Sequence, residues 1–116
     1  GIGINNFKFL CDSNNIYQNM MVYYKCASHP HNIYIQWLTE GGLIVFVLFI
    51  LYLIFLMFFI LNNNGDKKYK IVSIAVMIIL FWPIMSTGSL IKNWFGVSTF
   101  FIVGLCICLS KFRNNY

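Results

Sequence analysis

The sequence predicts an all-α integral membrane protein, in which three transmembrane helices follow a segment outside the membrane with short helices. Its 116 residues are 59% hydrophobic and only 9% charged, and the mean hydropathy is +0.73. Soluble domains carry about 45–50% apolar and about 25% charged residues. The composition therefore excludes an ordinary soluble enzyme, a disordered chain and a nucleic-acid-binding domain, and makes the lipid bilayer the expected surrounding.

The first transmembrane helix is predicted by one uninterrupted apolar run. Residues 1–42, which precede it, have a mixed composition and form the segment outside the membrane. Residues 43–61 contain no charge, no Gly and no Pro. As a helix they reach roughly 30 Å, which is the thickness of the hydrocarbon core of a bilayer.

Two more spans are expected in the rest of the chain. Pro83 stands near the end of the second, where it predicts a kink or a helix end. Trp94 opens the third as an anchor at the membrane interface. In chain order the expected parts are a polar turn (62–70), the second span (71–85), a polar return (86–93), the third span (94–110) and a tail (111–116).

Basic residues predict the orientation. Five of the eight Lys and Arg residues lie in the turn and the tail, which three spans place on the same side. The positive-inside rule makes this side cytoplasmic. Residues 1–42 and the return then lie on the outer side, and the formal net charge of +5 mostly reflects orientation.

The densest polar cluster surrounds two histidines, His29 and His31. Pro30 suits the first turn of a helix, which we expect to run to Glu40 and to break at the glycines before the membrane. His31 at a helix N-terminus can contact a phosphate oxygen or act as a base. Alternatively, both histidines are interfacial polar residues. No acidic or Cys set completes a metal site with them, so no metal is expected.

The run HPHNIYIQWLTEGG resembles the hallmark of the O-antigen ligase and polymerase family, a His-Asn pair followed by Glu-x-Gly before a membrane helix. Val45 stands where the family has a second Gly. The opening is similar to the family's Gly-x-Gly-x-x-x-Phe, and residues 82–94 resemble its final hairpin. The matching residues are Gly1, Gly3, Phe7, His31, Asn32, Tyr34, Leu38, Glu40, Gly42, Trp82, Pro83, Thr87, Gly88, Ser89, Asn93 and Trp94.

This resemblance implies a glycosyltransferase of the bacterial inner membrane that needs no cofactor. The donor would be a glycan on undecaprenyl diphosphate, and the acceptor a lipid A core sugar or a second lipid-linked glycan. Residues 1–42 would be periplasmic and the C-terminus cytoplasmic. The arginines that hold the diphosphate in the family have no counterpart, because Arg113 is the only arginine. The chain is therefore expected to be the C-terminal part of the enzyme.

The resemblance assigns the catalytic or diphosphate-contacting role to His31. Asn32 and His29 are candidate substrate-binding residues beside it. Glu40 either orients His31, binds an acceptor hydroxyl, or is a structural residue at the membrane boundary that holds the glycine turn. In one continuous helix, nine steps of about 100° would put Glu40 on the face opposite His31. Lys92 in the return either approaches the donor phosphates or extends to water from the interface.

Two cysteines, Cys11 and Cys26, fall in the outer segment. An oxidising compartment would permit a disulfide between them, but the sequence does not report their distance. A non-enzymatic function also remains open. In that case the chain is a small membrane subunit or a transporter fragment, and its histidines are only interfacial.

Overall fold

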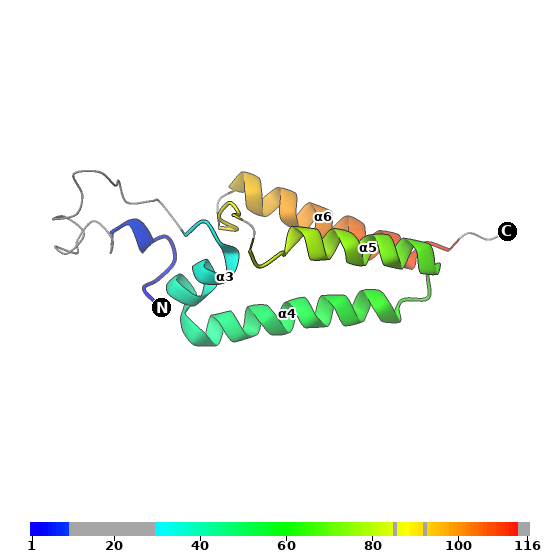
Figure 1. The fold of residues 1–116 in the computed structure, drawn as a ribbon, viewed down its shortest axis with the longest axis horizontal. Helices are drawn as coiled ribbons and strands as arrows, with labels where there is room; N and C mark the ends of the chain where they lie inside the picture. Colours follow the sequence, from blue (N-terminus) through cyan, green and yellow to red (C-terminus); the bar gives the residue numbers. More distant parts are fainter. Residues whose placement is uncertain (10–29, 85, 92, 114–116) are drawn as a thin grey trace.

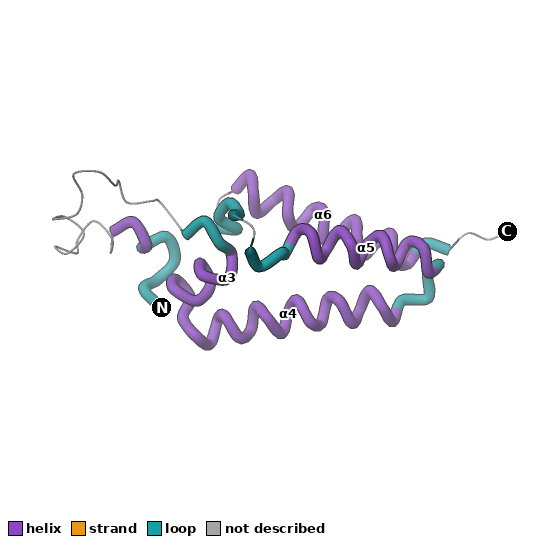
Figure 2. The backbone as a smooth tube through the Cα atoms, in the orientation of Figure 1, coloured by secondary structure: helices purple, strands orange, loops and turns teal. Residues whose placement is uncertain are grey.

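The computed structural model describes residues 1–9, 30–84, 86–91 and 93–113. Within these residues the regular structure is entirely helical, as predicted (Figure 2). The predicted sites His29, Lys92, Cys11 and Cys26 lie outside the described residues. In chain order the elements are α3 (Ile33–Gln36), η1 (Trp37–Gly41), α4 (Gly42–Asn62), α5 (Lys67–Leu80) and α6 (Asn93–Lys111), where η1 is a π-helix.

Two helical stretches are long and apolar enough to cross a membrane. One runs through α3, η1 and α4, from Ile33 to Asn62, and the other is Trp94–Lys111 in α6. The outer faces of α4 are apolar and exposed, as Ile44 (78% exposed) illustrates. Large exposed apolar surfaces mark contact with lipid or protein. The structure therefore contains two candidate membrane-spanning stretches, and the helices α4 and α6 within them have bounds within one residue of the predicted 43–61 and 94–110.

The third helix, α5, does not have the predicted bounds 71–85. It begins at Lys67 because the lysines of the polar turn join the helix, and it ends at Leu80. Pro83 accounts for this end, since proline disfavours helical backbone at the residue before it and cannot supply a helical N–H. Its 14 residues span roughly 21 Å. A third transmembrane span therefore stays a prediction.

The three long helices α4, α5 and α6 lie along one another, and each runs antiparallel to the one before it in the chain (Figure 1). α5 packs mainly on α6, and both helices contact α4. The Ser73 hydroxyl donates to the Cys106 carbonyl over 3.0 Å, which joins α5 to α6. The apolar core consists of Ile33, Phe49, Leu56, Ile60, Met77, Phe81, Leu90, Val103 and Cys106.

The expectation of one helix up to Glu40 is wrong in its details. The helix begins at Ile33, after an Asn32 cap, and changes to a π-helix at Trp37. The break itself falls at the predicted glycines, since Gly42 has φ 80° and ψ −178°. This backbone conformation is essentially restricted to glycine. The glycine therefore lets the chain change direction where the long apolar helix begins.

Candidate functional site

One end of the bundle carries the predicted site, and we call it the head. It consists of residues 1–3, 31–32, 81–84 and 86–91 together with α3 and η1. Asn32 lies at its centre, because its side-chain oxygen accepts from the N–H groups of Tyr34 (2.9 Å) and Ile35 (3.2 Å). The amide nitrogen of Asn32 donates to the Pro83 carbonyl over 2.7 Å. Asn32 therefore caps α3 and also attaches it to the segment after α5.

His31 and Tyr34 strengthen this attachment on either side of Asn32. The His31 carbonyl accepts from the Thr87 N–H over 2.8 Å. The Tyr34 hydroxyl donates to the Phe81 carbonyl over 2.6 Å. His31 itself is exposed. The backbone of the candidate catalytic residue is thus fixed in place, and its side chain belongs to the surface of the head.

We expect Asn32→Ala to lower the free energy of unfolding by about 2 kcal/mol, because both the cap and the link to Pro83 are lost. Asn32→Ser keeps a capping oxygen but has no amide to donate to Pro83, so it should lose about half as much. Detergent unfolding followed by circular dichroism measures both variants. Equal losses for Ala and Ser would show that the cap contributes nothing.

The two glycine motifs of the sequence meet in the head. At the break after η1, the carbonyls of Thr39 and Glu40 accept from the N–H groups of Ile2 (2.9 Å) and Gly3 (3.0 Å). A Cβ on Gly42 would lie 2.5 Å from the Gly1 nitrogen. The backbones approach closely because neither Gly1 nor Gly42 has a side chain. Segments about 40 residues apart in the sequence therefore form one packed unit.

Three polar side chains are buried beneath this unit. Glu40 is 3% exposed, Gln36 2% and Ser89 3%. The Gln36 amide nitrogen donates to Glu40 Oε2 (3.2 Å) and to Ser89 Oγ (2.7 Å). Ser89 Oγ also accepts from the Ile91 N–H over 3.3 Å. We call Gln36, Glu40 and Ser89 the buried polar cluster; in it Glu40 is buried and hydrogen-bonded to Gln36.

Gln36 was not among the site residues predicted from the sequence. The feature that could have indicated it is a polar side chain between apolar neighbours in the run IYIQWL. Its partner Ser89 lies 53 positions away, so only packing reveals the pair. Within the described residues, four buried atoms of the head have no hydrogen-bond partner, namely Gln36 Oε1, Trp37 Nε1, Glu40 Oε1 and Thr87 Oγ1.

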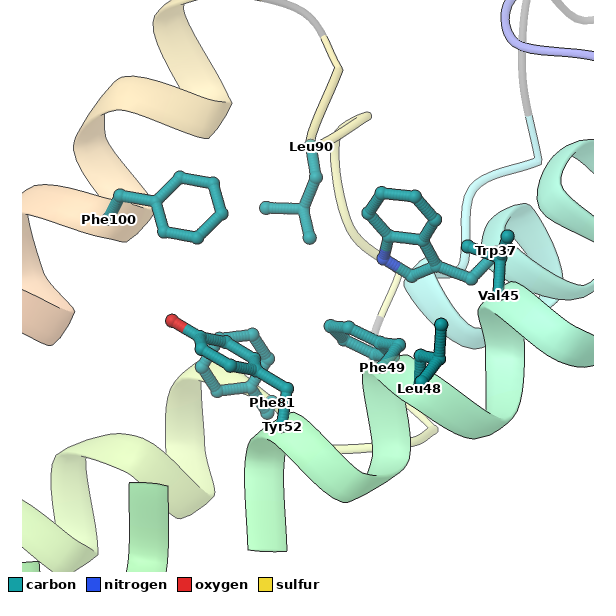
Figure 3. Close-up of a pocket in the computed structure, with 8 residues that line it drawn as sticks. All are labelled: Trp37, Val45, Leu48, Phe49, Tyr52, Phe81, Leu90 and Phe100. Atoms are coloured by element: carbon teal, nitrogen blue, oxygen red, sulfur yellow. The ribbon is translucent and has the colours of Figure 1, made fainter. Parts of the chain in front are cut away.

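An apolar cavity of about 390 Å³ adjoins the head. Figure 3 shows α4 side chains on one side of it and Leu90 and Phe100 on the other. Trp37 connects the cavity to η1, and its ring lies 5.6 Å from that of Phe49. The cavity is lined by Trp37, Val45, Leu48, Phe49, Tyr52, Phe81, Leu90 and Phe100. A lining of this kind suits a hydrocarbon ligand.

Within the part of the chain that the structure describes, no three His, Cys, Asp or Glu side chains gather as metal ligands. Comparison of the chain with protein-family models, curated proteins and solved structures found no match. The case for a function therefore depends on the motifs themselves and on their arrangement in the head.

Proposed function

We propose that this chain functions in a membrane glycosyltransferase of the O-antigen ligase or polymerase type. One observation supports this function above the others. In the head, hydrogen bonds and close backbone contacts join the segments that resemble the family. These segments are residues 1–3, the His31-Asn32 pair, Glu40–Gly42, and residues 83–84 and 86–89. Motifs that only shared a composition would have no reason to meet in three dimensions.

In the proposed reaction a hydroxyl group of the acceptor attacks the anomeric carbon of the donor sugar. The bond between that carbon and the diphosphate oxygen breaks, and the undecaprenyl diphosphate leaves with the bonding electrons. His31 accepts the proton of the hydroxyl group or, in its charged form, contacts the leaving diphosphate. Both roles need an imidazole at the surface of the head, where His31 is exposed.

The cavity beside the head suits the lipid part of the donor. Its lining is apolar and aromatic, and it lies between α4, the return and α6. A polyprenyl chain held there would keep its diphosphate close to the head. Asn32 contributes by attaching the segment after α5 to α3 rather than by an exposed amide, because both ends of its amide are already hydrogen-bonded.

The proposed location is the bacterial inner membrane, with the head on the periplasmic side. The apolar helices α4 and α6 support a membrane location. The lysines at the opposite end of the bundle support a cytoplasmic position for that end. In this orientation the head faces the compartment in which a flipped lipid-linked donor is available.

The test is His31→Ala in the protein that carries this chain. We expect glycan transfer from a lipid-linked donor to fall by about 100-fold or more, which is the usual contribution of a general base. Ser86→Ala is the matched control, since Ser86 is exposed in the same end of the bundle. Both variants are compared in bilayers at equal protein level.

Unchanged transfer by His31→Ala at normal protein level would contradict the role of His31. The runner-up function is a non-enzymatic membrane subunit. The buried polar cluster favours this non-enzymatic function, because its side chains are buried and bond to one another inside the head. Absence of any transfer by the intact protein, with several lipid-linked donors, would support that function instead.

A further inference from the structure

The end of the bundle opposite the head carries a concentration of positive charge, which we call the basic end. Asp66 is the one acidic residue within residues 62–116. Five of the chain's eight basic residues belong to residues 62–70 and 111–116, which form this end. They are Lys67, Lys68, Lys70, Lys111 and Arg113.

The fold brings these cations together from two segments. The Asp66 N–H donates to the Phe112 carbonyl over 3.0 Å, which joins the start of α5 to the end of α6. The rings of Tyr69 and Phe112 pack edge to face with centroids 5.2 Å apart. Residues 67–70 and residues 111–113 therefore lie side by side at this end of the bundle (Figure 1).

Three of the lysines make contacts within the chain, although that of Lys68 is only with the ring of its neighbour Tyr69, 5.2 Å from the centroid. Lys70 donates to the Leu61 carbonyl at the end of α4 over 3.0 Å. Lys111 lies over the Phe59 ring, 5.4 Å from its centroid. Lys70 satisfies a terminal carbonyl, and Lys111 is favoured by the negative pole at the C-terminal end of α6.

Lys67 and Lys68 are not explained by the stability of their own helix. Both are exposed in the first turn of α5, at the positive pole of the helix dipole, and that turn contains no acidic residue. A cation is disfavoured in this position. Together with the exposed Arg113 they raise the positive potential of the surface. A negatively charged partner would reduce the repulsion among these cations and between the lysines and the positive pole of the helix.

We propose that the basic end binds the phosphate-bearing headgroups of anionic bilayer lipids. Exposed apolar side chains border the cations, namely Leu61 (53%), Ile71 (56%) and Phe112 (53%). A surface that changes from basic to apolar fits the boundary between headgroups and acyl chains. Free phosphate and nucleic acid would leave these apolar side chains in water. This inference does not depend on the proposed transferase function.

The full chain, reconstituted in phosphatidylcholine bilayers, tests the proposal by electron spin resonance with spin-labelled lipids. We expect labelled phosphatidylglycerol to associate with the protein more strongly than labelled phosphatidylcholine. In K67Q/K68Q this preference should fall by up to about fivefold for each cation removed. K8Q is the matched control, because Lys8 is exposed and belongs to residues 1–9, the blue segment at the end of the molecule opposite the basic end (Figure 1).

Salt provides a second test on the unaltered chain, which remains decisive if the double variant fails to fold by circular dichroism. The preference should weaken as ionic strength rises, because exposed charges are screened. Equal association of the two lipids at low salt would overturn the proposal. So would displacement of phosphatidylglycerol by inorganic phosphate, or by an oligonucleotide, at the same ionic strength.

Discussion

Gly42→Ala should lower the free energy of unfolding of the chain by about 3 kcal/mol. Gly42 has φ 80° and ψ −178°, a conformation in which a side chain is strained. Its added Cβ would also lie 2.5 Å from the Gly1 nitrogen. The strain and the overlap act at the same junction, so the contact between the two glycine motifs should open.

The measurement is unfolding in a dodecyl sulfate titration, followed by tryptophan fluorescence. Trp37 lies in η1, and Trp82 lies in the segment that carries the head's return. Gly104→Ala is the matched control, because a Cβ there would meet nothing within 4 Å. In the middle of a helix that change should be neutral or stabilise by up to about 1 kcal/mol. Similar losses for both variants would show that the Gly42 backbone is not constrained.

Gln36→Leu should destabilise the chain by about 3 kcal/mol, since it removes the donor to a buried carboxylate. Glu40 Oε2 would lose the Gln36 amide, and Glu40 Oε1 already has no partner within the described residues. Ser89 would keep the N–H of Ile91 as its donor. The main loss is therefore the isolation of Glu40 in an apolar surrounding.

A double-mutant cycle separates this effect from simple loss of packing. Gln36→Leu/Glu40→Leu should be less destabilised than the sum of the two single variants, because removal of both polar partners leaves neither of them buried without the other. Ser98→Ala is the control, since its hydroxyl only bonds within its own exposed helix turn. It should stay within about 0.5 kcal/mol of the unaltered chain. Additive effects in the cycle would contradict the coupling.

Local sequence was enough to predict α4 and α6. Residues 43–61 have no charge, and any fold that this run adopts must place it in lipid or in a core. The start of α5 was less predictable, because Lys67 and Lys68 are compatible with either a turn or a helix. The effect of Pro83 also reaches back three residues to the end of α5 at Leu80. Helix bounds therefore depended on how each terminus is capped.

The site divides in the same way. The sequence singled out His31, Asn32 and Glu40 from their residue types and spacing. It did not reveal that Glu40 is buried against Gln36, nor that Asn32 holds Pro83 as well as its own helix. The contact between Asn32 and Pro83 joins positions 51 residues apart, and spacing along a chain carries no information about which distant residues meet.

The sequence by itself determined that the chain is helical, where its apolar helices lie, and that basic residues gather at one end of the bundle. These features follow from the hydropathy and charge of residues that are neighbours along the chain. Only the tertiary structure decided that Gly1–Gly3 meet Glu40–Gly42 and that Gln36 meets Ser89. Those contacts arise where α3, the return and the N-terminal segment pack together. Most buried polar groups need a hydrogen-bond partner, and the packing of the fold decides which group supplies it.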